Sequence, residues 1–423
     1  MATGLRIALY HNLPSGGAKR TVAETVSRLA RRHRVDLFTL ASADRSFCDV
    51  GPYVAESVTF PFQAGRLLPS PFGRLNQAVR LLDLWRVECF ARRIAAAVDR
   101  RGYDVALVHP CVVTQAPSPL FYLRTPSVYY CHEPLRALHE PAIPRPCRRE
   151  TRYRRALDRL DPLNRAYRSL LGRLDRRNLR SASLVLTNSS YTREAIRRIY
   201  GVVAEVNRVG VDAAAFRPLG IPREHLVISA GALKPEKGFD FVIASLGTIP
   251  PPRRPALSLV SNAEVPGERA YLERLAERWG VRVTFWMGVS DDELVRLYNT
   301  ALLTTYAPVR EPLGLVALES QACQTPVVAV AEGGVPETVV HGRTGLLVDR
   351  DAAEFGRAVG SLLADGALLD RYGREGRAHV REQWSWESSV AGLEVALLRA
   401  AGRGREALHT PTATGWASLE RLG

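Results

Sequence analysis

The sequence contains little lysine for a basic chain. Only three of its 58 basic residues are lysine, Lys19, Lys234 and Lys237, and the other 55 are arginine. Such a bias is typical of a GC-rich, actinobacterial-type bacterial genome. The three lysines therefore stand out, because an ammonium is the compact point charge that proteins commonly place against a phosphate.

Cysteine is also sparse. The six cysteines include no Cys-x-x-Cys pair, so no zinc site is predicted and reduced thiols in a cytoplasm are expected. The tripeptide Asp349-Arg350-Asp351 has the Asp-x-Asp spacing of some metal sites. We interpret it instead as the start of a helix, because an apolar helical pattern follows it. Neither a metal nor a cofactor is therefore expected.

Long apolar runs and a signal peptide are absent as well. No run approaches the ~20 residues that a membrane-spanning helix needs, and the first residues, MATGLRIALYHN, enter a predicted strand at once. We therefore expect a cytoplasmic protein. The chain has 423 residues, of which 46% are hydrophobic and 24% charged. This is the composition of a globular protein with two domains of about 200 residues each.

Much of the net charge of +15 lies in one tract. Residues 136–180 hold 14 arginines and five acids. The apolar residues of this tract follow a helical spacing, namely Leu157, Leu160, Leu163, Tyr167, Leu170, Leu171 and Leu174. A solvated helix face is the commonest origin of such a pattern, and contact with an anionic membrane surface is the second interpretation. Nucleic-acid binding is the least favoured, because no aromatic residues for base stacking are interleaved.

Short apolar strands alternate with helical patterns in both halves, which predicts α/β domains with parallel sheets. The strands expected in the first half are 5–10, 35–40, 103–109, 127–130 and 184–188. Those expected in the second half are 226–229, 257–260, 283–287, 301–306, 327–330 and 345–348. Residues 51–73 contain several prolines and glycines and are expected to be irregular, before a helix over 75–98.

The most informative stretch runs from Arg310 to Asp349. Two carboxylates, Glu311 and Glu319, stand eight positions apart across a Pro-Leu-Gly segment that ends a loop and begins a helix. A glycine turn at a helix N-terminus leaves backbone N–H groups free for a phosphate or a polyol. We expect Glu319 to accept from two ribose hydroxyls, and Glu311 to face the group that the nucleotide carries. For either acid alone, simple complementation of the helix dipole is the alternative.

Two loops of the first half follow predicted strands. Gly16 and Gly17 open the first helix, where a diphosphate or a sugar can approach the backbone closely, although no G-x-G-x-x-G spacing is present. His132 and Glu133 follow the strand at 127–130, at the edge where open α/β sheets bind ligands. We expect His132 to donate to a sugar hydroxyl or to meet an acceptor. A structural histidine is the alternative, and Glu133 is the weaker acceptor-side candidate.

The lysines lie in two glycine-containing loops. Lys234 and Lys237 belong to GALKPEKG, which follows the strand at 226–229, and Lys19 follows the first glycine pair. We interpret all three as candidates for contacts with phosphate or sugar, with an ordinary surface position as the alternative.

These motifs carry a family resemblance. EPLGLVALESQACQTPVV followed by GGVPETVVHGRTGLLV resembles the E-x7-E signature of the retaining GT-B glycosyltransferases of family 4. VLTNSSYTREAIRRIYG and NRVGVDAAAFRPL are similar to that family's interdomain passage, and the resemblance covers nearly residues 5–400. The chain departs from the family pattern at three places. Gln324 replaces a usual glycine, Ala232 stands where an arginine is expected beside the donor diphosphate, and Ser261-Asn262-Ala263 replaces usual glycines.

The resemblance implies a GT-B fold of two Rossmann-like domains facing a cleft. Its parts are an acceptor-side domain (1–215), a nucleotide-sugar-binding domain (222–383), a last helix crossing back to the first domain (384–401) and a mobile tail (402–423). It implies catalytic roles for Glu311, His132 and Lys237. The donor-binding candidates are Gly16, Gly17, Lys234, Pro312, Leu313, Gly314, Leu315 and Glu319. The acceptor-side candidates are His132, Glu133 and Lys19, and the loop 285–289 is expected to contact the base.

The implied reaction is transfer of a sugar from a nucleoside-diphosphate sugar with retention of configuration and without a required metal. We expect a small molecule or specialised metabolite as acceptor, because no hydrophobic anchor is visible in the sequence. A lipid or cell-surface glycan acceptor, reached by peripheral membrane contact through 136–180, is one alternative. A nucleotide-sugar 2-epimerase is another. A basic module that binds membranes or nucleic acid is the non-enzymatic alternative, but it leaves the glycine, lysine and glutamate motifs without a role.

Overall fold

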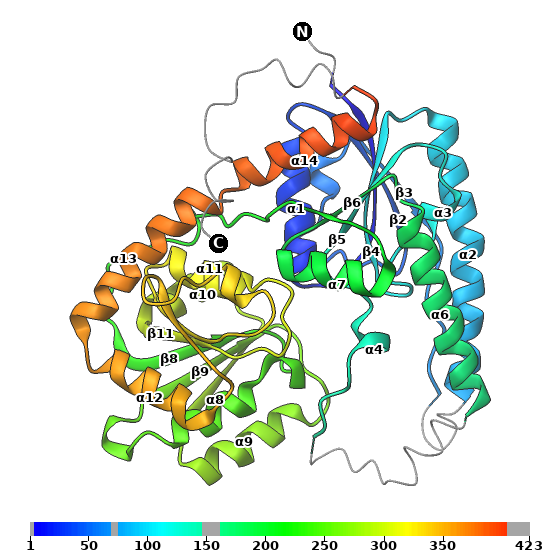
Figure 1. Cartoon of the computed structure of the whole chain (residues 1–423). Helices are drawn as coiled ribbons and strands as arrows, with labels where there is room; N and C mark the ends of the chain where they lie inside the picture. The colour runs from blue at the N-terminus through cyan, green and yellow to red at the C-terminus, as the bar shows by residue number, and fades with distance from the viewer. Residues whose placement is uncertain (1–3, 69–74, 146–160, 404–423) are drawn as a thin grey trace.

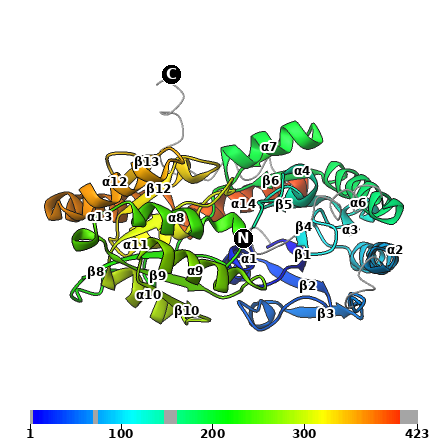
Figure 2. The ribbon, with the colours of Figure 1, turned by 90° about the horizontal axis from the view of Figure 1, so that it is seen from below.

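Each half of the chain builds one parallel β-sheet (Figure 1). The computed structural model describes residues 4–68, 75–145 and 161–403. The first sheet has the strand order β3-β2-β1-β4-β5-β6-β7 and the second has the order β10-β9-β8-β11-β12-β13. All pairings between these strands are parallel. Figure 2 shows the two sheets side by side with helices around them. The predicted pair of Rossmann-like α/β domains is confirmed.

The first sheet consists of β1 (Arg6–Asn12), β2 (Arg34–Leu40), β3 (Glu56–Phe60), β4 (Val105–Cys111), β5 (Ser127–Cys131), β6 (Leu184–Thr187) and β7 (Glu205–Val206). The helices of this half are α1 (Gly17–Leu29), α2 (Asn76–Arg101), α3 (Pro119–Tyr122), α4 (Arg136–His139), α6 (Pro162–Arg180) and α7 (Ser190–Tyr200), with a 3-10 turn at η1 (Gly51–Tyr53).

The second sheet consists of β8 (Glu224–Ala230), β9 (Ala256–Ser261), β10 (Val283–Met287), β11 (Ala301–Tyr306), β12 (Val327–Val330) and β13 (Gly345–Val348). Its helices are α8 (Phe239–Gly247), α9 (Glu268–Trp279), α10 (Asp291–Thr300), α11 (Leu315–Ala322), α12 (Ala352–Leu363), α13 (Gly366–Gln383) and α14 (Trp386–Ala400). Its 3-10 turns are η3 (Pro235–Lys237), η4 (Pro251–Arg253) and η5 (Val335–Glu337).

The expectation that residues 51–73 are wholly irregular is wrong. Residues Glu56–Phe60 form β3, which pairs with β2 at the edge of the first sheet. Three of its five residues are exposed and the other two are half-buried. An edge strand with this little burial carries no continuous apolar run, so the signal that marks central parallel strands is missing.

Capping residues set the helix starts. Asp351 accepts from the Glu354 N–H at 2.7 Å at the start of α12, so the interpretation of the Asp-x-Asp tripeptide as a helix N-terminus is confirmed. Ser290 begins α10 in a capping box with Glu293. No helix within 4–68, 75–145 or 161–403 is both long enough and apolar enough to cross a membrane.

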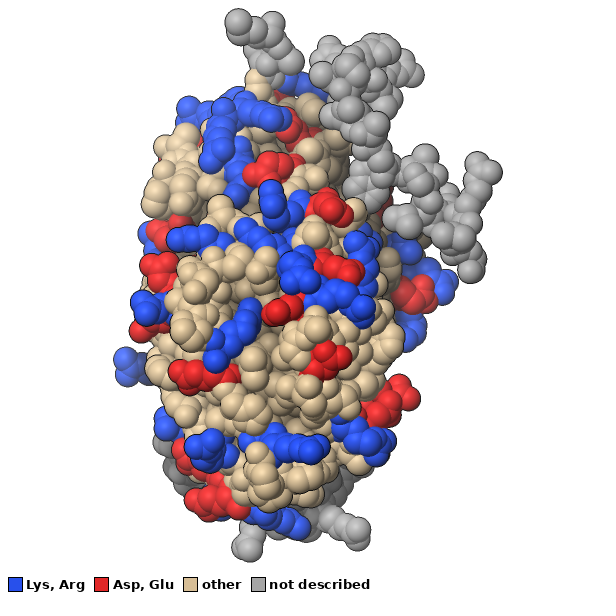
Figure 3. Space-filling view, turned by 90° about the vertical axis from the view of Figure 1, so that its left-hand side faces the viewer, with Lys and Arg blue, Asp and Glu red and all other residues tan. Residues whose placement is uncertain are grey.

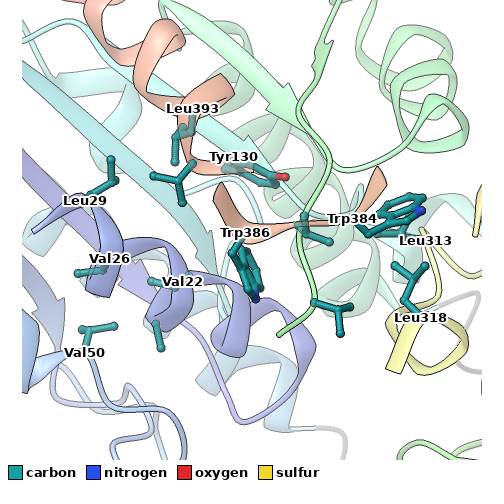
Figure 4. Close-up of a cluster of buried hydrophobic side chains, with 14 of the residues drawn as sticks. Val22, Val26, Leu29, Val50, Tyr130, Leu313, Leu318, Trp384, Trp386 and Leu393 are labelled. Atoms are coloured by element: carbon teal, nitrogen blue, oxygen red, sulfur yellow. The ribbon is translucent and has the colours of Figure 1, made fainter. Parts of the chain in front are cut away.

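The last helix packs on the first half of the chain. Figure 4 shows Trp386 beside Val22 of α1, in a buried cluster that continues to Leu313 and Leu318 of the second half. Gly210 makes room for this passage, because a Cβ there would lie 2.4 Å from the Trp386 nitrogen. One apolar cluster thus joins α14 to α1 and to the loop before α11. The predicted tail lies almost entirely outside the described residues, as do Leu157 and Leu160 of the basic tract.

Candidate active site

Two helix N-termini face each other between the sheets. Gly16 (φ 148°) precedes α1, and Gly314 (φ 112°) precedes α11. A Cβ on Gly17 would lie 3.2 Å from the side chain of Leu315, so the first turns of these helices are neighbours. Both glycines adopt backbone angles that other residues rarely reach. The paired turns bring backbone N–H groups from both halves toward one place, which suits an anionic group.

Lys237 and Glu311 meet at this place. The Lys237 ammonium donates to both carboxylate oxygens of Glu311, at 2.8 and 2.9 Å, and the two side chains are 24% and 15% exposed. Gly231 gives the lysine stem its room, since a Cβ there would lie 3.2 Å from the Lys237 Cδ. The structure therefore brings together two of the three predicted catalytic residues, from a loop after β8 and a loop after β11.

The loop that carries Glu311 is held from both halves. The Glu311 carbonyl accepts from the Gly334 N–H at 2.8 Å, and a Cβ on Gly333 would lie 2.5 Å from the same oxygen. From the first half, the Ser189 hydroxyl donates to the Pro312 carbonyl at 2.5 Å. The Gly-Gly turn is thus required by close packing against the loop that carries Glu311, and contacts from both halves hold the segment before α11.

Glu319 lies inside the fold on α11. Its side chain is buried, and the Tyr298 hydroxyl donates to it at 3.3 Å. Burial raises the pKa of Glu319 to about 7, while the nearby Arg20 guanidinium opposes this rise and the Asp291 carboxylate adds to it. A carboxyl group that titrates near neutrality in this position is unusual, and it marks Glu319 as a candidate binding group.

The helix periodicity of α1 separates two adjacent basic residues. Arg20 reaches the second domain and forms a bidentate ion pair with Asp291, at 2.6 and 2.7 Å. Lys19 instead is fully buried, and its ammonium donates to the Asp44 carbonyl after β2. This burial does not support the expected acceptor-side role of Lys19. Arg20 was not predicted from the sequence, where it is one arginine among 55.

His132 is one of three buried histidines at the carboxyl ends of neighbouring strands. His11 is the last but one residue of β1, His109 lies two residues before the end of β4, and His132 follows β5. His109 Nδ1 lies 3.2 Å from His132 Nε2, and the ring of His132 lies 4.8 Å from that of Tyr130. Burial lowers the pKa of His132 to about 3 and that of His11 to about 4. The neutral imidazole of His132 can donate to a hydroxyl but carries no charge. The sequence did not single out His11 or His109 as partners.

Glu133 lines a cavity of about 220 Å³ between α4, α7 and the Glu311 loop. Burial raises the pKa of Glu133; Arg136 opposes this rise, Glu311 adds to it, and Lys237 opposes it. The lining residues are Glu133, Pro134, Arg136, His139, Glu140, Tyr191, Thr192, Ala195, Arg198, Ile199, Arg310 and Pro312. The cavity contains polar groups of both charge signs and opens next to the predicted catalytic carboxylate.

The remaining predicted positions, Lys234, Leu313 and the loop 285–289, also lie in the second domain. Lys234 is exposed at the start of η3, and Leu313 is buried in the cluster of Figure 4. The loop 285–289 lies at the carboxyl end of β10 with Trp286 and Met287 each 40% exposed, and its contact with a base stays a prediction. Within the part of the chain that the structure describes, no group of three or more His, Cys, Asp or Glu residues is arranged to hold a metal ion.

Comparison with known families covers both halves. Residues 15–214 match the family described as Glycosyltransferase Family 4, and residues 212–379 match the family described as Glycosyl transferases group 1. The chain belongs to the GT-B glycosyltransferases of family 4. The E-x7-E glutamates and Lys237 lie within the second match, and Gly16, Gly17 and His132 lie within the first.

Relatives of this glycosyltransferase family include a D-inositol 3-phosphate glycosyltransferase of Segniliparus rotundus, 38% identical over 48% of this chain and 46% of the relative. A GDP-mannose-dependent alpha-(1-6)-phosphatidylinositol monomannoside mannosyltransferase of Mycobacterium tuberculosis is 36% identical over 48% and 59%. The chain spans about half the length of the curated relatives it matches.

Solved structures show the same fold. A sucrose-phosphate synthase from Thermosynechococcus elongatus superimposes with a TM-score of 0.71 at 23% identity, over 93% of this chain and 98% of that one. The Anabaena protein HepE in complex with UDP and glucose gives a TM-score of 0.66 at 20% identity, over 93% and 99%. At these identities the likeness establishes the GT-B arrangement of this family member, and its site must be argued from its own residues.

Proposed function

We propose that the chain transfers a sugar from a nucleoside-diphosphate sugar to an acceptor hydroxyl with retention of anomeric configuration. The observation that carries this proposal is the pairing of Lys237 with Glu311, at 2.8 and 2.9 Å, in front of the α11 N-terminus. An ammonium and a helix N-terminus suit a diphosphate, and a carboxylate beside them suits sugar hydroxyls. The turn at Gly16 and Gly17, which lies against Leu315 of α11, supplies a second approach to a phosphate.

In this proposal the bond between the anomeric carbon and the phosphate oxygen breaks while the acceptor oxygen attacks from the same face. The departing phosphate takes the proton of the acceptor hydroxyl, so no separate general base is required. Lys237 and the N–H groups at Gly314 and Leu315 stabilise the charge that develops on the phosphate. Glu311 and the neutral His132 orient the sugar by hydrogen bonds to its hydroxyls. Glu319 accepts from the ribose.

The cavity beside Glu311 is the proposed acceptor site. Three arginines line it, Arg136, Arg198 and Arg310, with Glu133 and Glu140 as the acidic lining residues. The net positive lining suits a small acceptor that carries an anionic group. The two named relatives act on compounds that contain inositol phosphate or phosphatidylinositol, which agrees with this chemistry. A small polar acceptor is therefore the first candidate.

A membrane-bound acceptor is the second candidate, because one surface of the first domain suits an anionic bilayer. On α6, Arg165, Arg168, Arg173, Arg176 and Arg180 are exposed, while the helix's one acid, Asp175, is buried. Figure 1 shows α2 beside α6. On α2, Leu82 (54%) and Trp85 (64%) are exposed. On the face drawn in Figure 3, by contrast, charges of both signs are interspersed. Arginine beside exposed tryptophan and leucine is the composition of interfacial membrane contacts.

The test begins with a thermal-shift screen of UDP-, GDP-, ADP- and dTDP-sugars, followed by product analysis with and without acceptor candidates. Stabilisation by one nucleotide series and a glycoside product that keeps the donor's anomeric configuration support the proposal. A changed sugar nucleotide formed without any acceptor indicates the 2-epimerase instead.

Cosedimentation with phosphatidylglycerol vesicles tests the membrane-bound acceptor. Loss of vesicle binding in Trp85→Ala supports the membrane surface, provided that a variant of the exposed Val203 shows no such loss.

A further inference from the structure

A short segment of the first domain crosses to the second. After α4, residues 140–145 run toward α9 (Figure 1). Arg310 binds this segment at its start, by an ion pair with Glu140 at 3.4 Å and by donation to the Pro141 carbonyl at 3.3 Å. The segment is therefore fastened to the second domain from the active-site loop onward, and Arg145 stands at its far end.

Arg145 is almost completely buried in the second domain. Its side chain is 2% exposed, and that of its partner Glu268 is 3% exposed. The guanidinium donates to Glu268 at 2.8, 3.0 and 3.1 Å and to Asp240 at 2.6 and 3.2 Å. It also lies 5.1 Å from the ring centre of Tyr271. The planar guanidinium suits this arrangement, because it can donate to both carboxylates at once.

The partners of Arg145 bracket Lys237 in the sequence. One Arg145 nitrogen donates to the Pro235 carbonyl at 3.3 Å, two residues before Lys237, and Asp240 follows three residues after it. Each guanidinium nitrogen is already engaged with protein oxygens, so Arg145 is not available as a phosphate ligand. It therefore does not replace the arginine that Ala232 lacks. Arg145 instead holds the chain on both sides of Lys237, through the Pro235 carbonyl and the Asp240 carboxylate.

Two other ion pairs between the domains are more open to solvent than the pair of Arg145 and Glu268. Arg20 and Asp291 are 18% and 56% exposed, and Arg310 and Glu140 are 28% and 23% exposed. Water and salt weaken such pairs, while a buried pair in good geometry is screened far less. We therefore expect loss of Arg145 to disturb the position of the Pro235–Lys237 turn more than loss of either exposed pair.

We propose that Arg145 is a positioning residue of the donor site: the first domain uses it to hold the Pro235–Lys237 turn of the second domain so that Lys237 meets the donor diphosphate. This inference rests on the proposed function, because it assigns the turn to diphosphate recognition. It predicts a defect confined to the phosphate that Lys237 contacts. Binding of the nucleoside part, which involves other residues, should stay intact.

The test compares diphosphate and monophosphate binding by isothermal titration calorimetry. UDP, GDP, ADP and dTDP are screened against the wild type, and the nucleotide that binds is compared with its monophosphate. We expect Arg145→Ala to reduce the preference for the diphosphate by about tenfold, with monophosphate affinity changed less than about twofold. Arg145→Lys should restore part of the preference, because one ammonium can still bridge the two acids. Arg197→Ala is the control, since Arg197 forms an exposed pair with Glu194 on α7.

Asp240→Asn covers the case in which Arg145→Ala does not fold. It keeps the side-chain volume, weakens the contact on one flank of Lys237, and should lower the same preference by a smaller factor. An equal loss of monophosphate and diphosphate binding in the folded variants, or an unchanged preference, would overturn the positioning role. If the wild type binds none of the four diphosphates, the proposed function itself fails and the inference falls with it.

Discussion

At the scale of single residues, the pair of Lys237 and Glu311 has two uses. Without a donor, each side chain neutralises the other, at 2.8 and 2.9 Å, in a site that is partly shielded from water. In the proposed reaction, the ammonium turns to the phosphate of the donor and the carboxylate turns to the sugar. The contact therefore holds both side chains in place before the proposed substrate arrives.

Removing either member should abolish most of the turnover. We expect Glu311→Ala and Lys237→Ala each to lower kcat/KM by about a hundredfold or more, the usual effect of deleting a group that stabilises the transition state. Product formation measures the loss, and circular dichroism checks that the fold is kept. Arg197→Ala is the control, because Arg197 forms an exposed ion pair with Glu194 on α7. Activity near that of the wild type in both variants would refute these roles.

The pKa of Glu319 gives a prediction with a definite sign. Since burial raises this pKa from 4.5 to about 7, the folded protein holds the proton more tightly than the unfolded chain. Glu319 therefore costs stability as the pH rises from about 4.5 through about 7, by at most about 3 kcal/mol. Glu319→Gln should remove this cost, so the variant should lose less stability than the wild type between pH 5 and pH 8. Urea unfolding at both pH values measures the difference, and equal pH dependence in the two proteins would contradict it.

Site residues that belong to a sequence motif were predictable. Residues whose position depends on how a helix packs were not. Glu311 and Lys237 stand in glycine-containing loops, and Glu319 stands on the helix that follows the first of these loops. Their spacing predicts a site, and the structure places Glu311 and Lys237 in contact. Lys19 and Arg20 are adjacent in sequence, and only the docking of α1 determines that Lys19 is buried and Arg20 faces Asp291. A rule that singles out rare lysines cannot detect this, because helix orientation depends on the whole core.

At the scale of elements, α14 joins the two halves through one large side chain. Trp386 is 4% exposed and packs against α1, and the Arg28 guanidinium lies 5.7 Å from its ring centre. Trp386→Ala leaves a cavity between the halves and should destabilise the protein by about 3–5 kcal/mol. Val395→Ala on the same helix should change the stability by less than about 0.5 kcal/mol, because Val395 is 53% exposed. Denaturant unfolding compares them, and similar losses in both would show that α14 contributes little.

The strands of the second sheet were predictable, including its edge strands β10 and β13, whereas the edge strands β3 and β7 of the first sheet were not. The bounds predicted for 283–287, 301–306 and 327–330 coincide with β10, β11 and β12. Most of these segments are apolar runs between clear breaks, which is the pattern of a parallel sheet covered on both faces. β3 and the two-residue β7 have half-exposed side chains and few apolar residues, so pairing with a neighbour creates them and no local signal precedes it.

At the scale of the whole molecule, the two domains touch through several polar contacts around the site. Glu337 of the second domain accepts from the Ser190 and Tyr191 N–H groups at the start of α7, at 3.0 and 2.9 Å. On the opposite side, Arg20 of α1 pairs with Asp291. A carboxylate at a helix N-terminus and an ion pair at the surface are each modest contributions, of roughly 0.3–1 kcal/mol. The Glu337 contact and the Arg20–Asp291 pair together connect the two domains at two separate places around the Glu311 loop.

Because each contact is modest, closure of the domains should respond to their combined loss. We expect the double variant Arg20→Ala/Glu337→Ala to show a larger radius of gyration in solution than either single variant, measured by small-angle X-ray scattering without nucleotide. Saturation with the nucleoside diphosphate that binds should return the double variant toward the wild-type value, since a ligand that contacts both domains shifts the equilibrium to the closed form. Arg399→Ala is the control, as it removes an exposed pair with Glu205 away from this loop. A double variant with unchanged dimensions would mean that the apolar cluster around Trp386 alone sets the domain arrangement, and that the polar contacts serve only the local geometry of the site.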